Sequence, residues 1–195
     1  MTKTGGRLMR PEEHTILIVD DDEKILGSLQ RTFERLGYNV LVATSGEEGL
    51  DILRSEDVKL IISDVRMPTM SGVGFLEKAK EAAPDAVRIV ITGYADIQAA
   101  ADAINSLGVF KFILKPWDRY HLEKVVHQGL EYHNTVRENK QLHKRLMEQN
   151  EELARKADSA AKVAAAMERK VAELEDKLDK LYAKYPDARP KQGKG

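Results

Sequence analysis

The sequence predicts an α/β fold in which a five-stranded parallel sheet is followed by one long helix. Between Thr15 and Leu114, short apolar runs alternate with segments of helical period, which is typical of repeated strand-helix units. The runs are rich in Val, Ile and Leu without strict alternation, as expected for strands covered on both faces. From Asp118 to Tyr185 helix formers dominate, and this stretch contains no Pro and only one Gly, Gly129.

The apolar runs predict five strands, at residues 15–19, 38–43, 58–63, 87–91 and 109–114. Four helices are predicted between them. The first is indicated by apolar residues from Ile25 to Leu36 and a stop at Gly37. Ser45 is a suitable N-cap for the second, which carries acids in its first turn. The remaining two are predicted at residues 75–82 and 96–106.

The long C-terminal helix, predicted over residues 118–185, has a continuous heptad pattern. Its strongest stretch is Met167 to Tyr185, whereas polar residues and then alanines weaken its middle. Asn150 at a favours a parallel two-stranded register, although a single solvated helix would also tolerate it. We therefore expect a parallel homodimer. The a positions are Leu122, Gly129, Val136, His143, Asn150, Ala157, Ala164, Val171, Leu178 and Tyr185, and the d positions are Val125, Tyr132, Asn139, Leu146, Leu153, Ala160, Met167, Leu174 and Leu181.

Charged e and g positions support the parallel register, because Lys170 of one helix can reach Glu175 of a parallel partner. Such exposed pairs contribute little stability. The predicted organisation is a flexible N-terminus at 1–14, an α/β domain at 15–132, a coiled-coil extension at 133–185 and a disordered tail at 186–195.

Composition narrows the function classes. The chain has 195 residues, and 31 basic against 32 acidic residues leave a formal charge of −1, so no global field favours nucleic acid or an anionic membrane. The absence of cysteine suits a reducing cytoplasm, and no apolar run is long enough for membrane insertion. Direct DNA binding is not expected. The five histidines, at 14, 121, 127, 133 and 143, are expected to be solvated.

Polar side chains follow four of the predicted strands. Asp20 and Asp21 end the first, Asp64 follows the third, Thr92 the fourth and Lys115 the fifth. In an open parallel sheet, sites lie beyond the carboxyl ends of the strands, so these residues are expected around one pocket. Clustered carboxylates need a neutralising cation, and oxygen ligands favour Mg²⁺ or Mn²⁺. A carboxylate there could attack a phosphoryl group.

The motifs that surround these residues resemble the receiver domain of two-component response regulators, the CheY-like family. The likeness covers Thr15 to about Tyr132 and implies a flavodoxin-like fold. The motifs that carry it are Ile16-Leu17-Ile18-Val19-Asp20-Asp21, Ile62-Ser63-Asp64-Val65-Arg66-Met67-Pro68 with Ser71-Gly72, Ile91-Thr92-Gly93 and Phe112-Ile113-Leu114-Lys115-Pro116.

The resemblance implies a role for each matching residue. Asp64 would accept the phosphoryl group, and Lys115 would contact it. Mg²⁺ would be held by Asp20, Asp21 and Asp64 with the backbone carbonyl of Arg66. Thr92 and Phe112 would form a switch, although Phe112 also suits a plain core position. These roles and residues are expectations from the family.

The resemblance implies a signalling protein rather than a metabolic enzyme, whose chemistry is limited to metal-dependent phosphorylation and dephosphorylation of itself. Its expected partners are a sensor histidine kinase or phosphotransfer protein and a downstream protein reached through the C-terminal helix. Two alternatives stay open: a receiver and linker fragment of a larger regulator with an enzymatic output domain, and a structural coiled-coil protein with a degenerate receiver.

Overall fold

A computed structural model describes residues 14–93 and 107–185 of the chain. Strands and helices alternate, and the five parallel strands have the order β2-β1-β3-β4-β5. The strands are β1 (Thr15–Val19), β2 (Asn39–Ala43), β3 (Leu60–Asp64), β4 (Val87–Thr92) and β5 (Lys111–Leu114). The predicted parallel sheet is confirmed. Strands β3 and β5 each begin two residues later than predicted.

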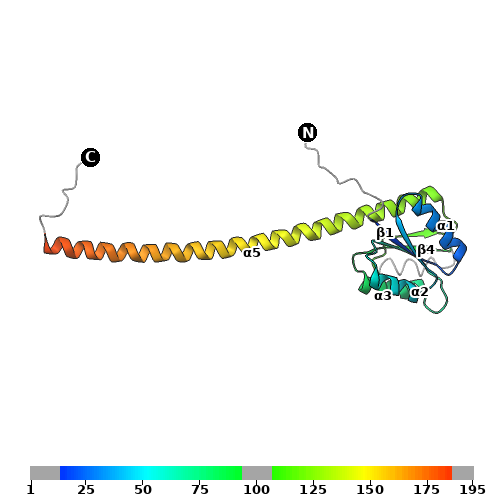
Figure 1. Cartoon of the computed structure of the whole chain (residues 1–195), viewed down its shortest axis with the longest axis horizontal. Helices are drawn as coiled ribbons and strands as arrows, with labels where there is room; N and C mark the ends of the chain where they lie inside the picture. The colour runs from blue at the N-terminus through cyan, green and yellow to red at the C-terminus, as the bar shows by residue number, and fades with distance from the viewer. Residues whose placement is uncertain (1–13, 94–106, 186–195) are drawn as a thin grey trace, which may run out of the picture. The chain divides into compact units, whose positions relative to one another are not determined.

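Helices cover both faces of this sheet (Figure 1). They are α1 (Glu23–Glu34), α2 (Gly46–Ser55), α3 (Gly72–Ala82) and α5 (Arg119–Lys184). Asp22 caps α1 by accepting from the amide of Lys24, and Ser45 caps α2 as expected. The helix predicted at 96–106 lies outside the described residues.

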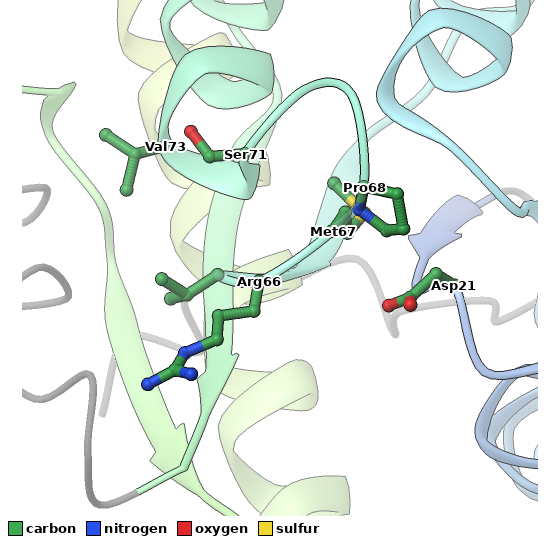
Figure 2. Close-up of a pocket in the computed structure, with 7 residues that line it drawn as sticks. Asp21, Arg66, Met67, Pro68, Ser71 and Val73 are labelled. Carbon is green, nitrogen blue, oxygen red and sulfur yellow. The ribbon is translucent and has the colours of Figure 1, made fainter.

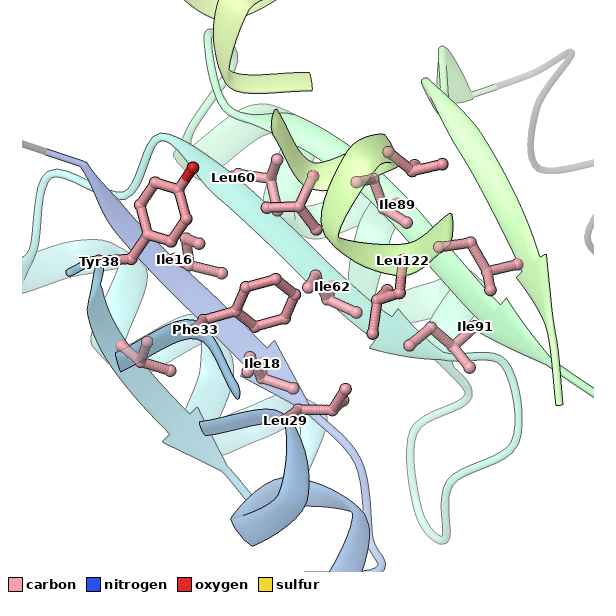
Figure 3. Close-up of a cluster of buried hydrophobic side chains, with 14 of the residues drawn as sticks. Ile16, Ile18, Leu29, Phe33, Tyr38, Leu60, Ile62, Ile89, Ile91 and Leu122 are labelled. Atoms are coloured by element: carbon pink, nitrogen blue, oxygen red, sulfur yellow. The ribbon is translucent and has the colours of Figure 1, made fainter. Parts of the chain in front are cut away.

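One core cluster joins α1 and the start of α5 to the sheet. Phe33 and Leu122 are fully buried there against Ile16, Ile62 and Ile89 of three strands (Figure 3). A second cluster packs α2 and α3 against the opposite face through Leu53 and Phe75. With both faces covered, the sheet edge at the carboxyl ends of the strands remains for polar groups.

Gly129 lets α5 lie close to the sheet. A Cβ at this position would stand 2.9 Å from Cδ1 of Leu60 and 3.2 Å from Cγ1 of Val87. Leu122 and Gly129, which the heptad pattern assigns to a coiled-coil seam, are instead buried in the core of the α/β domain. An apolar helical stripe looks the same in sequence whether a sheet or another helix covers it.

Two histidines correct the expectation that all five are solvated. His14 and His133 are 5% and 4% exposed. The Nδ1 of His133 lies 2.8 Å from the carbonyl oxygen of Asp85, and Nε2 of His14 lies 3.2 Å from Oδ1 of Asn134. One ring nitrogen of each buried imidazole thus has a protein partner in place of water, whereas Nε2 of His133 is buried and has no partner among the described residues.

The chain divides into two units, residues 1–139 and 140–195. The first contains the sheet, and the second contains the remainder of α5. Within the described residues, the second unit has no buried side chain. The boundaries predicted from sequence at 132 and 133 stay predictions, but burial of α5 continues to His133.

Candidate functional site

Asp20 and Asp64 are neighbours because β1 and β3 pair in parallel with Val19 opposite Ser63. Asp20 follows the last residue of β1, and Asp64 ends β3. The amide of Asp22 donates to Oδ1 of Asp20 at 2.9 Å, and the amide of Val65 donates to Oδ1 of Asp64 at 2.7 Å. Each carboxylate is therefore oriented by the backbone of its own strand-end loop.

Lys115 links the two carboxylates. It follows β5, and its amide donates to the carbonyl oxygen of Thr92 at 2.8 Å. Its Nζ donates to Oδ2 of Asp20 at 3.0 Å and to Oδ2 of Asp64 at 2.7 Å. Residues separated widely in sequence thus meet in one polar cluster, as the strand-end pattern predicts. The Lys115-Pro116 peptide bond is cis.

The cluster holds more negative than positive charge. Ligand oxygens of Asp20, Asp21 and Asp64 lie within 4.8 Å of one another, and Lys115 bridges Asp20 and Asp64. Because carboxylate oxygens repel at such distances, a hard divalent cation suits this set. The donor chemistry therefore fits the Mg²⁺ or Mn²⁺ expected from sequence.

Burial and pairing shift two pKa values in this cluster. Desolvation raises the pKa of Asp20, although its hydrogen bonds with the Asp22 amide and Lys115 oppose the shift. Burial by itself lowers the pKa of Lys115, but hydrogen bonds to Asp64 and Asp20 outweigh that cost and raise it. Lys115 is consequently a firmly charged ammonium group at neutral pH.

The loop after β3 is held close to Asp64 by a glycine. A Cβ at Gly72 would stand 1.6 Å from the carbonyl oxygen of Asp64, which no side chain could tolerate. The amide of Gly72 donates to the carbonyl oxygen of Val65 at 2.9 Å, and Ser71 caps α3. In the Ser71-Gly72 motif, Gly72 is therefore required because the backbone of Asp64 leaves no room for a side chain, and Ser71 is the N-cap of α3.

The other predicted residues lie close by in the fold but differ in their contacts. Thr92 is fully buried, and its hydroxyl donates to the carbonyl oxygen of Gly93 at 3.3 Å. Phe112 is half-buried and packs against the second core cluster. It pairs with Val90 across β4 and β5. A switch formed by Thr92 and Phe112 stays a prediction.

A pocket of about 670 Å³ adjoins the acidic cluster. Asp21 and the loop residues Met67 and Pro68 border it, while the side chain of Arg66 extends away from Asp21 (Figure 2). Val65 and Val73 complete much of its apolar wall. The sequence predicted the acids but not the apolar wall of this pocket, because Val65 lies in the loop after β3 and Val73 in the first turn of α3, and the two share no periodic signal.

Comparison with known proteins agrees with this geometry. The model of the response regulator receiver domain family matches residues 16–127. That match spans more than half of the chain, so the protein belongs to the response regulator receiver family. Within residues 14–93 and 107–185, no helix is long and apolar enough to cross a membrane.

Proteins similar to this chain include transcriptional regulators. The hydrogenase transcriptional regulatory protein HoxA of Cupriavidus necator is 37% identical over 123 residues, covering 63% of this chain and 25% of that protein. The transcriptional regulatory protein GlrR of Escherichia coli is 37% identical over 116 residues, covering 60% of this chain and 26% of that protein. The chain thus matches about a quarter of the length of these relatives.

Solved structures show the same fold. An uncharacterized protein from Neptuniibacter caesariensis is 43% identical, with a TM-score of 0.64 and coverage of 67% of this chain and 96% of that chain. A structure titled adenylate cyclase from Rhodopirellula baltica is 31% identical, with a TM-score of 0.65 and coverage of 67% and 97%. A shared receiver fold with differently named proteins identifies the class, not the output.

Proposed function

We propose that this protein is a two-component response regulator in which Asp64 accepts a phosphoryl group from a histidine kinase or phosphotransfer protein. The observation that carries this proposal is the bridge from Lys115 to Asp20 and Asp64 beside a third carboxylate, Asp21. An ordinary surface turn would not bury Asp20 to 2% exposure with such a partner. The intact cluster also argues against a degenerate receiver.

The chemistry assigns separate tasks to these groups. A carboxylate oxygen of Asp64 would bond to phosphorus while the phosphorus-nitrogen bond of the donor phosphohistidine breaks, leaving the imidazole. Lys115 would then transfer its hydrogen bonding to the added phosphoryl oxygens. Asp20, Asp21, Asp64 and the Arg66 carbonyl would hold Mg²⁺ or Mn²⁺, whose charge offsets that of the phosphoryl group. Attack of water on phosphorus would release phosphate and regenerate Asp64.

The proposed switch couples this chemistry to the rest of the domain. The Thr92 hydroxyl, which now donates to Gly93, would turn to the new phosphoryl oxygen. That movement would open space for Phe112 to move further inward. The surface around β4 and β5 would then differ between the two states, and this difference is the proposed signal to partners.

The second part of the proposal is a parallel homodimer formed through α5. Leu174, Leu178 and Leu181 remain 54%, 48% and 51% exposed in a single helix. They alternate between d and a positions, so pairing with a second copy would remove a continuous apolar stripe from water. Lys170 contacts Glu173 of its own helix at 2.9 Å, and the proposed partner contact to Glu175 would compete with this pair.

Intact mass spectrometry with light scattering tests the proposal. Acetyl phosphate and Mg²⁺ should add one phosphoryl group to the wild-type chain and none to Asp64→Asn. Asp57→Asn is a matched control, since this carboxylate is 82% exposed and lies before β3 rather than after it. A phosphoryl group that persists in Asp64→Asn would exclude Asp64 as the acceptor.

A second candidate is a receiver and linker within a larger regulator that has its own output domain. The observation that favours this candidate is that the chain matches only about a quarter of HoxA and of GlrR. If beryllofluoride changes the assembly of this chain alone, output through α5 is supported. Phosphorylation without any change in mass, shape or helicity would favour the larger regulator.

A further inference from the structure

The part of α5 beyond residue 139 has two segments that differ at heptad positions e and g, the positions that flank the a/d seam. Positions e and g of the distal segment, Met167–Tyr185, include Glu168, Lys170, Glu175 and Lys177, as expected for a two-stranded coiled coil. In the proximal segment, Leu142–Ala164, positions e are uncharged throughout, and Lys156 is the one charged g residue. The apolar face is therefore wider in the proximal segment than a two-stranded seam requires.

The wide flank is solvent-exposed in the single helix. Leu142 and Val163 at g are 54% and 52% exposed, and Met147 at e is 53% exposed. Lys156 bonds to Glu152 of the same helix at 2.6 Å, so its charge is already paired at the outer edge of the flank. Ala154 and Ala161 complete the e positions with small side chains that permit close helix approach.

The central seam of the proximal segment is weak. Its a positions are His143, Asn150, Ala157 and Ala164, which bury little apolar area in a two-stranded coil. In the proposed parallel dimer, g of one helix lies beside e of the other, so Leu142 would lie beside Met147 of the partner subunit. Each side of the dimer would then present an apolar groove that the two-stranded seam leaves uncovered.

We propose that each groove binds an amphipathic helix of another protein, giving a four-helix bundle around residues 142–164. This inference rests on the proposed parallel dimer. The groove is about 33 Å long at about 1.5 Å per residue, enough for three heptads of a partner helix. Bulky apolar residues of that helix would fill the space above Ala154 and Ala161.

The charged residues beside the groove predict the charge of the partner helix. Within residues 107–185, neither Lys144 nor Arg145 forms an ion pair, whereas Glu152 and Asp158 are paired with Lys156 and Lys162. Lys144 and Arg145, at b and c, flank the groove at its N-terminal end. The partner helix therefore carries acidic residues at that end.

A second copy of this chain fits the groove less well. An antiparallel copy centred on Ala154 would bring its residues 169–185 alongside the start of α5, where Leu122, Val126 and Gly129 are already buried against the sheet. Four parallel copies would press the charged flanks of the distal segment together. A different protein, with complementary charge, avoids both conflicts.

Cysteine-directed cross-linking tests this inference, because the chain has no native cysteine. Ala161→Cys at e and Lys162→Cys at f are matched neighbours, and the f position faces away from the groove. Each full-length variant would carry benzophenone maleimide, be irradiated in an extract of the source cells, and have its cross-linked peptides sequenced. Ala161→Cys should label one amphipathic, acid-bearing segment that Lys162→Cys does not.

A synthetic peptide of that segment then provides the binding measurement. We expect it to bind the dimer, and the double change Lys144→Glu with Arg145→Glu to weaken binding at least tenfold without altering the dimer mass. Equal labelling from both cysteines, labelling of this chain alone, no labelling or no peptide binding would each overturn the inference. A tetramer by light scattering would also overturn it.

A third variant separates this inference from the dimer proposal. Leu174→Cys lies at d of the distal segment and should form an intermolecular disulfide in a parallel dimer. If no disulfide forms and the mass is that of a monomer, the proposed dimer fails and the groove fails with it. If the disulfide forms but Ala161→Cys labels no partner, the groove inference alone fails.

Discussion

Between Arg119 and His133, α5 buries six residues in the α/β domain, whereas the part from Lys140 to Lys184 buries none. Both parts follow one heptad pattern in sequence. The first part gains its stability from Leu60, Val87 and Ile89 of the sheet, whereas no described residue of this chain covers the apolar stripe of the second part. The same periodicity thus supports a tertiary contact in one region and the proposed association surface in the other.

The largest difference between the two regions should come from matched leucines. Leu122→Ala should lower the free energy of unfolding by about 2–5 kcal/mol because it opens a cavity in the core. Leu146→Ala, at a residue that is 57% exposed, should change it by less than about 0.5 kcal/mol. Denaturant titration followed by fluorescence of Trp117, the single tryptophan, reports this domain. Equal losses of unfolding free energy in the two variants would show that the two parts of α5 contribute equally to the stability of the α/β domain.

A substitution in the proposed association surface should weaken the dimer without changing the stability of the α/β domain. Leu174→Ala should weaken the dimer at least tenfold, about 1.4 kcal/mol, because the distal seam loses apolar area from both subunits. The Trp117 unfolding midpoint should stay unchanged. Sedimentation equilibrium measures the dimer, and Arg169→Ala at an outward f position is the control. A shifted midpoint would contradict independent stabilisation of the two units.

Gly129→Ala tests how closely α5 packs against the sheet. A methyl group at 2.9 Å from Leu60 should cost about 1–3 kcal/mol through overpacking, partly offset by about 1 kcal/mol of helix propensity. The net expectation is a loss of about 1 kcal/mol in the Trp117 titration. A more stable variant would mean that Leu60 and Val87 yield readily to the added methyl group.

The smallest expected effect concerns pH. Burial lowers the pKa of His133, although its hydrogen bond to the Asp85 carbonyl opposes the shift, and Lys59, Arg137 and His14 add to the lowering. The unfolded chain therefore binds a proton more readily, so stability is full above about pH 6.5 and falls as pH drops toward the lowered native pKa.

His133→Asn removes this proton linkage while keeping a donor for the Asp85 carbonyl. The difference in unfolding free energy between wild type and variant should shrink as pH falls from 7 to 5. Comparing the two chains cancels the opposite contribution of Asp20, whose raised pKa favours the folded state at low pH. A pH-independent difference would show that His133 titrates alike in both states.

Periodicity predicted the strands, their parallel arrangement and the long helix, because the spacing of apolar residues reflects which face must leave water. Sequence also placed Asp20, Asp64 and Lys115 at strand ends, and parallel pairing made their meeting a necessary consequence. Their roles in phosphoryl transfer stay predictions. The sequence motifs predicted membership of the response regulator receiver family, and the comparisons confirmed it.

Other features depended on contacts that no pattern encodes. His14 and His133 are buried by residues distant in sequence, and the pocket beside Asp21 arises where a loop folds back. The sequence alone determined an α/β domain with acids at its strand ends and an amphipathic helix. The folded chain shows which part of that helix the sheet covers, because the burial of an apolar stripe depends on what packs against it and not on the stripe itself.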